Sequence, residues 1–131
     1  VLEGMKKNGW NKTKVITAET IGASSFYQSF HANELVELKE ITSIATSLAA
    51  KKVTAKALVM IKDFNAVPFT MDDRDAINAS IGIMDEYSVL VEAACGASLS
   101  VPYFHPHLIE NDKNILVIVC GGANNQIREY L

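Results

Sequence analysis

The sequence lacks the features that mark several large classes of protein. It has no cluster of Lys or Arg and a formal net charge of -3 at pH 7, which argues against a nucleic-acid-binding surface. No apolar run approaches the roughly 20 residues that a membrane-spanning helix needs, and the first residues do not resemble a signal peptide. Its two cysteines, Cys95 and Cys120, do not form a Cys-x-x-Cys pair. Such cysteine usage fits a reducing compartment, and we predict a cytoplasmic protein.

The composition that is present suits one modest domain. The chain has 131 residues, of which 49% are hydrophobic and 21% are charged. It shows no internal repeat and no linker-like shift in composition, so we predict that residues 1–131 form a single unit. The high apolar share favours a surface partly covered by a second domain or by a partner.

The most distinctive stretch is Asn114-Ile-Leu-Val-Ile-Val-Cys-Gly-Gly122. Five branched apolar residues before a Gly pair predict a strand over 115–119 that is buried on both faces and ends in a turn. Ligands of open α/β sheets bind just outside the carboxyl ends of such strands. Gly121 and Gly122 would let a flat or anionic group approach the backbone, with Cys120 as the last side chain before the turn. An ordinary buried strand with a Gly turn is an alternative that this pattern alone leaves open.

The rest of the chain predicts alternating helices and strands. In the first half we expect a helix that ends at Gly9, a strand over 15–19, a turn at Gly22, a helix over 24–31 and an amphipathic helix through Ile41, Ile44, Ala45 and Leu48. We then expect a helix capped by Thr54 and running to about Phe64, and an edge strand over 66–69. The last elements are a helix opened by a capping box at 70–73 with a stripe of Ile77, Ile81 and Met84, a helix from about Glu92 with Cys95 and Leu99 on one face, and a short helix to Leu131. Such alternation predicts an α/β domain with a mainly parallel sheet.

Two polar clusters allow a metal-binding interpretation. Asp72, Asp73 and Asp75 begin a predicted helix, where carboxylates are favourable because of the helix dipole, and we prefer that explanation. His105 and His107 flank Pro106, and this spacing is more typical of a loop than of a metal pair.

Four segments in order resemble a known family: 17–26 (Thr-Ala-Glu-Thr-Ile-Gly-Ala-Ser-Ser-Phe), 41–48 (Ile-Thr-Ser-Ile-Ala-Thr-Ser-Leu), 90–97 (Leu-Val-Glu-Ala-Ala-Cys-Gly-Ala) and 117–122 (Val-Ile-Val-Cys-Gly-Gly). They are similar to the consecutive C-terminal motifs of the eukaryotic L-serine/L-threonine dehydratases, and most of all to the fungal catabolic enzymes. These are pyridoxal-phosphate enzymes of the tryptophan-synthase-β fold type. The resemblance covers the chain from Gly4 onward and implies a partial three-layer αβα domain, as in the C-terminal part of fold-type II enzymes.

The resemblance also implies two sets of site residues. Cys120 matches the cysteine beside the pyridine nitrogen of pyridoxal phosphate, and Gly121 and Gly122 match the turn against which the ring lies. A thiol is a weak partner for that nitrogen. The family's monovalent cation is surrounded, partly through backbone carbonyls, at positions that match Glu19, Ala23, Ser25, Leu48 and Ala50. Without the resemblance, we would interpret Glu19 as a surface carboxylate at a strand end.

Several parts of the family pattern are missing from this chain. No lysine here matches the family's Schiff-base lysine, and the Gly-rich phosphate loop and the Asn-bearing substrate loop are also absent. Ala93 stands where the family has proline, Ala49 follows Leu48 where the family has glycine, and Pro102 falls within an expected helix.

The resemblance therefore implies a truncated L-serine dehydratase-like protein that is inactive alone, from an enzyme class that serves amino-acid catabolism and gluconeogenesis. The parent reaction is deamination of L-serine to pyruvate, or of L-threonine to 2-oxobutanoate, with release of ammonia. In one alternative the chain is part of a split dehydratase, completed by a partner that carries the lysine and the Gly-rich loop; a homodimer is also possible. In another it is a non-catalytic remnant that keeps the fold.

Overall fold

A computed structural model of the chain describes residues 1–122. In chain order its elements are α1 (Leu2–Lys7), β1 (Lys14–Thr20), η1 (Ile21–Ala23), α2 (Ser25–Ala32), η2 (Thr46–Leu48), α3 (Ala55–Met60), η3 (Ile61–Asp63), β2 (Asn65–Met71), α4 (Asp73–Tyr87), α5 (Ala93–Phe104) and η4 (Pro106–Leu108), where η denotes a single 3-10 turn.

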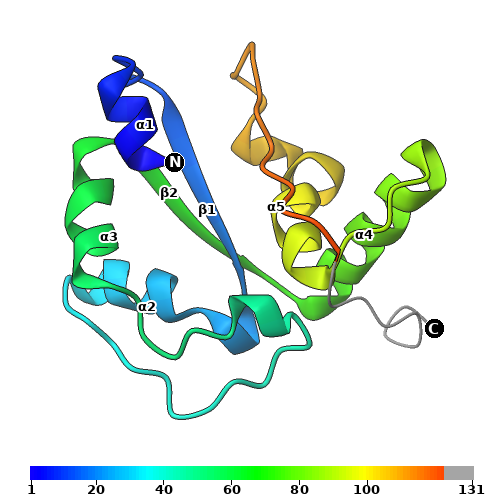
Figure 1. Cartoon of the computed structure of the whole chain (residues 1–131), viewed down its shortest axis with the longest axis horizontal. Helices are drawn as coiled ribbons and strands as arrows, with labels where there is room; N and C mark the ends of the chain where they lie inside the picture. Colours follow the sequence, from blue (N-terminus) through cyan, green and yellow to red (C-terminus); the bar gives the residue numbers. More distant parts are fainter. Residues whose placement is uncertain (123–131) are drawn as a thin grey trace.

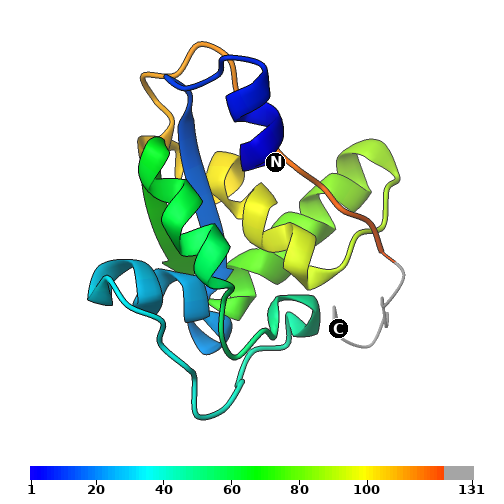
Figure 2. The ribbon, with the colours of Figure 1, turned by 60° about the vertical axis from the view of Figure 1, so that its left-hand side comes forward.

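The two strands of the described residues form a parallel pair at the centre of the fold. β1 and β2 run in register from Lys14 opposite Asn65 to Thr20 opposite Met71. Helices α2 and α3 lie on one side of this pair, and α5, backed by α4, lies on the other (Figures 1 and 2). The predicted α/β class with a parallel sheet is confirmed.

The core is concentrated where α5 meets α4 and the sheet. One buried cluster contains Ala79, Val91, Cys95 and Leu99, and a second contains Met71, Ala76 and Ala97. The two helices approach so closely that a Cβ added to Gly96 would lie 1.9 Å from the Ala76 carbonyl oxygen. Gly96 is therefore needed for this approach, since a side chain at that position would collide with backbone.

Most of the predicted elements are confirmed. The strand at 14–20 and the helices at 25–32, 73–87 and 93–104 lie within a few residues of their predicted bounds. Gly9 follows the first helix with φ of +72°, as expected for a residue just past a helix end. Thr54 caps α3 by accepting the Ala57 N–H. Pro102 is accommodated in the last turn of α5, which ends at Phe104.

The predicted helix through Ile41, Ile44, Ala45 and Leu48 is wrong. Only Thr46–Leu48 forms a helical turn, of the 3-10 type. The Ser43 hydroxyl accepts the Ala45 N–H at 3.0 Å, and the Asp73 carboxylate accepts the Ile44 N–H at 3.1 Å. These side-chain acceptors take amides that a helix would bond to its own backbone.

The predicted strand over 115–119 is also absent from the structure. Four of its five residues are exposed, and only Val117 packs against the core. Within residues 1–122, β1 and β2 pair only with each other, so this segment has no neighbouring strand. A strand exists only through its ladder, and an apolar pattern cannot supply the missing neighbour. The predicted helix to Leu131 lies outside the described residues.

The start and the inward face of α4 also differ from prediction. Thr70 belongs to β2, Asp72 is the N-cap residue and no side chain caps the helix. The buried side of α4 consists of Ala76, Ala79 and Ser80, whereas the predicted stripe of Ile77, Ile81 and Met84 is half-buried or exposed. Small residues face α5 because Gly96 brings the two helices so close.

We predict that Gly96→Ala lowers the free energy of unfolding by about 3 kcal/mol, the upper end of the range for overpacking. The new methyl group would meet the Ala76 carbonyl and the Ser80 hydroxyl, so α4 and α5 must separate. Urea denaturation followed by circular dichroism measures the change.

Gly82→Ala in α4 is the matched control. Its Cβ would lie no closer than 3.4 Å to another residue, at the Tyr103 ring. Because alanine is the better helix former, this variant should keep its stability or gain up to about 1 kcal/mol. Equal losses in both variants would contradict the close-approach argument.

Candidate functional site

The loop that contains Thr42 and Ser43 lies at the carboxyl ends of β1 and β2. A series of hydrogen bonds between hydroxyl groups holds it there. Thr20, fully buried at the end of β1, donates to the Ser43 hydroxyl at 2.7 Å, and Ser43 donates to the Asp73 carboxylate at 2.6 Å. Thr42 N–H also donates to the Gly22 carbonyl at 3.1 Å. A Cβ on Gly22 would lie 2.6 Å from the Ser43 nitrogen, so glycine is required here for the close approach of two backbones.

Glu19 lies beside this loop and faces the start of α2. Its two carboxylate oxygens accept the N–H groups of Phe26 at 3.0 Å and Tyr27 at 2.7 Å. Burial raises the pKa of this carboxyl group, and the two amide hydrogen bonds partly oppose that rise. Among the ion pairs of residues 1–122, none includes Glu19. Glu19 is thus a half-buried, hydrogen-bonded carboxylate rather than the surface group that its sequence alone suggests.

The other predicted cation residues fall into two groups. Ala23 and Ser25 are buried beside Glu19 at the turn that leads into α2. Leu48 is the last residue of η2, and Ala50 follows two residues later; we call residues 46–50 the η2 loop. The Leu48 side chain packs against the cluster of Met71, Ala76 and Ala97. No three His, Cys, Asp or Glu side chains of residues 1–122 form a metal-binding cluster, so any cation here would depend on backbone oxygens around Glu19.

The Gly121 turn is held by the start of α5. The Gly121 carbonyl accepts the Glu92 N–H at 3.1 Å and the Cys95 thiol at 3.2 Å. The Gly121 N–H in turn donates to the Cys95 sulfur at 3.4 Å. Gly121 has a φ of +137°, which side-chain-bearing residues rarely adopt. The predicted Gly turn therefore exists, although no strand precedes it.

Glu92 joins the two parts of the candidate site. Its N–H holds the Gly121 carbonyl, and its side chain accepts a hydrogen bond from the Ser47 hydroxyl of the η2 loop. The cation residues Leu48 and Ala50 belong to the same loop. Glu92 thus connects the Gly121 turn directly to Ser47 of η2.

One side of the Gly121 turn is open, so a flat group could approach the backbone there. Among residues 1–122, no atom lies within 4 Å of a Cβ built on Gly121, and Cys120 is exposed next to it. Six lysines lie in hydrogen bonds elsewhere, none to Cys120, Gly121 or Gly122: Lys6, Lys14, Lys51, Lys52, Lys56 and Lys62. The turn is thus open on one side within the described residues, and none of these six lysines bonds to it.

Comparison with known proteins decides the family. The model of the family described as "Pyridoxal-phosphate dependent enzyme" matches residues 1–121. The chain belongs to this family of pyridoxal-phosphate dependent enzymes. It is 40% identical over 132 residues to an L-serine dehydratase of Dictyostelium discoideum, and 36% identical over 132 residues to a human L-serine dehydratase/L-threonine deaminase. These alignments cover 97% and 95% of this chain.

The fold agrees with a solved member of this enzyme class. A fungal L-serine ammonia-lyase from Rhizomucor miehei superposes with a TM-score of 0.93 at 32% identity over 98% of this chain. The chain spans 38% and 40% of the length of the two curated relatives and 42% of the fungal chain. The predicted resemblance to L-serine/L-threonine dehydratases is confirmed, and so is the fold class that it implied.

Several structural residues of this site were not predicted from the sequence. Asp73 anchors the loop at Ser43 as well as beginning α4, and Asp75 pairs with His105 at 3.1 Å between its Oδ2 and the ring Nε2. From the sequence we interpreted these carboxylates only as residues favoured by the helix dipole at the start of α4. Cys95 and Leu99 were predicted to lie on one face of a helix, and they share one buried cluster, but nothing in the sequence pairs Cys95 with Gly121.

We predict that Gly121→Ala detaches this turn from α5. An alanine at φ of +137° is strained, so the turn will relax and withdraw its carbonyl from Glu92 and Cys95. Hydrogen exchange of the Glu92 amide should accelerate at least tenfold. Gly4→Ala in α1, where a Cβ also meets nothing within 4 Å, should leave that amide unchanged. Full protection of Glu92 in Gly121→Ala would contradict this role of the turn.

Proposed function

We propose that this chain forms one wall of the cofactor site of an L-serine dehydratase-like enzyme. The reaction would be the pyridoxal-phosphate-dependent deamination of L-serine to pyruvate and ammonia, with L-threonine as a second substrate. The single observation that carries the proposal is the Gly121 turn, open in front and fixed behind by Glu92 and Cys95, in a chain 40% identical to an L-serine dehydratase. The proposal includes the cytoplasmic location favoured by the cysteine usage.

In this proposal each residue of the turn has a limited task. Pyridoxal phosphate, when bound, supplies the electron sink that makes loss of the substrate's α-proton possible. Cys120 would lie next to the ring nitrogen and leave it less protonated than a carboxylate would. Gly121 and Gly122 would let the ring lie against the backbone. Each of these residues orients the ring; none transfers a proton from the substrate.

The chain alone would not carry out this reaction. The family's cofactor lysine has no match here, and a Schiff-base lysine is normally desolvated so that its pKa falls. None of the six paired lysines named above has such surroundings, because their partners are carboxylates, carbonyls or an amide oxygen near the protein surface.

A second candidate function is that of one chain of a split dehydratase, completed by a polypeptide that carries the lysine and the Gly-rich loop. The segment 115–119, which joins no strand within residues 1–122, favours it, because its four exposed branched apolar residues are costly to leave uncovered. A domain that keeps this fold without the chemistry is the remaining alternative.

We expect no pyruvate from L-serine when the purified chain is incubated with pyridoxal phosphate. The same tube should show no visible absorbance band that survives gel filtration and is discharged by borohydride. The control is the full-length Dictyostelium L-serine dehydratase under the same conditions. Pyruvate formed by the chain alone, with a borohydride-sensitive band, would show that one of its own lysines performs the chemistry.

We also propose a monovalent-cation site around Glu19, Ala23, Ser25, Leu48 and Ala50. The pKa of Glu19 is raised, so the folded chain loses stability as pH rises through that pKa and the half-buried carboxylate ionises. Potassium bound to the ionised carboxylate offsets this loss. At five times its dissociation constant it would add about 1 kcal/mol. Below the raised pKa the group is neutral and the potassium effect should vanish.

Thermal melts in potassium chloride and in tetramethylammonium chloride of equal ionic strength test this site. Wild type should melt higher in potassium at pH 8, and this difference should disappear at a second, acidic pH well below the ordinary pKa of a glutamate. Glu19→Gln should show no potassium effect at either pH, whereas the exposed Glu34→Gln should behave as wild type. A potassium effect that survives in Glu19→Gln would exclude this carboxylate as the cation's partner.

A further inference from the structure

The two cysteines of the chain meet at the Gly121 turn. The buried Cys95 thiol donates to the Gly121 carbonyl at 3.2 Å, and its sulfur accepts the Gly121 N–H at 3.4 Å. Cys120, which is bonded covalently to that nitrogen, is exposed. Covalent geometry keeps the Cys120 Cα about 2.4 Å from the Gly121 nitrogen, so this Cα lies within about 6 Å of the Cys95 sulfur.

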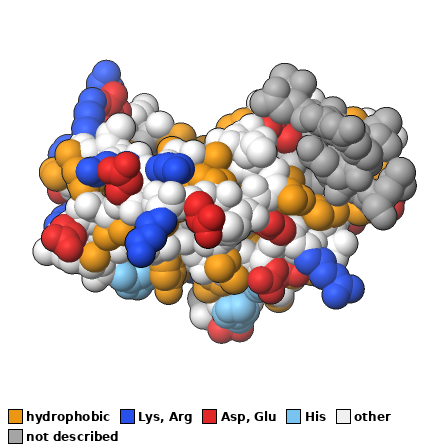
Figure 3. All heavy atoms as spheres, turned by 90° about the horizontal axis from the view of Figure 1, so that it is seen from below, with side chains coloured by type: hydrophobic (Ala, Val, Ile, Leu, Met, Phe, Trp, Pro, Cys, Tyr) orange, Lys and Arg blue, Asp and Glu red, His pale blue; other side chains and the backbone are white. Residues whose placement is uncertain are grey.

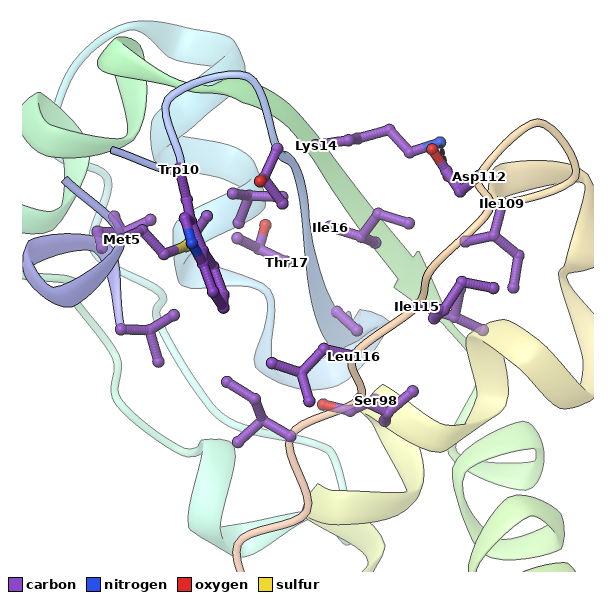
Figure 4. A pocket seen from close by; sticks show the side chains of 18 of the residues that line it. Met5, Trp10, Lys14, Ile16, Thr17, Ser98, Ile109, Asp112, Ile115 and Leu116 are labelled. Carbon is purple, nitrogen blue, oxygen red and sulfur yellow. Dashed lines mark ion pairs between the residues drawn. The ribbon is translucent and has the colours of Figure 1, made fainter. Parts of the chain in front are cut away.

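The packing of the segment before Cys120 keeps the two cysteines close. Val117 packs against the buried cluster that contains Cys95. Leu116 and Ser98 of α5 both line the apolar groove beside β1 (Figure 4). The segment that leads to Cys120 therefore runs along α5, and Cys120 follows it at the first turn of this helix.

The distance that remains between the two sulfurs can be closed by a local movement. A disulfide requires Cα atoms within about 7 Å of each other and Cβ atoms about 4 Å apart. Rotation of the Cys120 side chain and a small shift of the turn toward α5 satisfy this requirement, because the Cys120 Cα already lies so near the Cys95 sulfur. The turn has room to rearrange, since within residues 1–122 no atom lies within 4 Å of a Cβ built on Gly121.

We propose that Cys120 and Cys95 form a peroxide-sensitive thiol pair, in which Cys120 is oxidised first and Cys95 converts the product into a disulfide. The Cys120 thiolate attacks one oxygen of hydrogen peroxide. An S–O bond forms, the O–O bond breaks, and the departing hydroxide takes up the proton that the thiol released. The Cys95 sulfur then attacks the Cys120 sulfur: the S–S bond forms, the S–O bond breaks, and hydroxide leaves as water with the Cys95 proton. Two thiols are thus oxidised to one disulfide, and one peroxide is reduced to two waters.

The surroundings of the two cysteines determine the order of these steps. Cys95 is 4% exposed and its thiol is engaged with Gly121, whereas Cys120 is exposed. Oxidation of cysteine follows exposure, and a neighbouring thiol converts the first oxidation product into a disulfide. In a reducing compartment the pair would rest as two thiols and would return to them once the peroxide is consumed.

The charges around the turn favour a small, uncharged oxidant. The six lysines of residues 1–122 named above bond elsewhere and not to Cys120. The face drawn in Figure 3 carries acidic and basic side chains interspersed. A charged oxidant is concentrated by a field of one sign, which interspersed charges weaken. Hydrogen peroxide needs no such field.

Intact mass after peroxide treatment tests the thiol pair. The reduced, folded chain is treated with hydrogen peroxide, and the reaction is stopped with catalase. We expect a loss of about 2 Da and of both free thiols, which dithiothreitol should restore. Digestion with trypsin without reductant should give residues 75–113 joined to residues 114–128, each with one cysteine. Persistence of both free thiols, or disulfide-linked dimers in place of the internal bond, would overturn the proposal.

Two serine variants separate the roles of the cysteines. Cys95→Ser keeps a hydroxyl donor toward Gly121, and its oxidation should stop at the Cys120 sulfenic acid, which dimedone traps. Cys120→Ser should react with peroxide at least tenfold more slowly, because its remaining thiol is buried. Both should keep the wild-type circular dichroism spectrum. Equal dimedone labelling of wild type and Cys95→Ser would exclude the reaction of Cys95 with oxidised Cys120, and equal rates in the two variants would exclude the order of the steps.

A redox titration tests whether the fold holds the two thiols together. In glutathione buffers the disulfide should be at least tenfold more favoured in the folded chain than in the urea-unfolded chain, a midpoint about 30 mV more negative. An equal or less negative midpoint in the folded chain would refute the proposal. These measurements use neither pyridoxal phosphate nor L-serine, so their outcome and that of the pyruvate assay are independent.

Discussion

The close contact between α4 and α5 determines where both halves of the candidate site lie. Gly96 allows the backbone of α5 to approach the Ala76 carbonyl, at a distance that no side chain would permit. α4 begins with Asp73, which holds the loop over the ends of the strands. α5 begins after Glu92, which holds the Gly121 turn. One glycine in a helix interior, normally unfavourable by about 1 kcal/mol relative to alanine, thus positions residues 73 and 92 together.

The sequence predicted elements well wherever the local pattern and the tertiary surroundings agree. The strand at 14–20 and the helices α2, α4 and α5 follow from periodicity and capping, and the structure contains them. The helix expected around Ile44 fails because Ser43 and Asp73, 30 residues apart, capture its amides. Helical spacing of apolar residues cannot reveal a distant acceptor. The sequence showed no apolar run long enough to span a membrane, and in residues 1–122 no helix is both long and apolar enough to cross a bilayer.

The sequence named candidate site residues, which stay a prediction, but it did not give their contacts. The resemblance identifies Cys120, Gly121 and Gly122, and also Glu19 and its group, by position in a motif. It does not say that Glu19 would be half-buried against the first amides of α2, or that Cys95 would bond to Gly121. These contacts depend on how α2 and α5 pack on opposite sides of β1, which is a property of the assembled layers (Figure 2). A sequence motif indicates candidate residues by position and does not indicate the hydrogen bonds and packing that hold them.

Segment 115–119 shows why an apolar pattern and its structure can disagree without either being in error. Five branched residues are typical of a strand buried on both faces, yet within residues 1–122 four of them are exposed and Val117 is half-buried. Residues 115–118 line a groove together with residues 14–18 of β1, which pairs only with β2 within residues 1–122. Burying its exposed side chains would contribute about 25 cal/mol for each Å² of apolar surface. Part of that gain must offset the entropy lost on association. The apolar pattern of residues 115–119 therefore predicts a buried environment that residues 1–122 supply only in part.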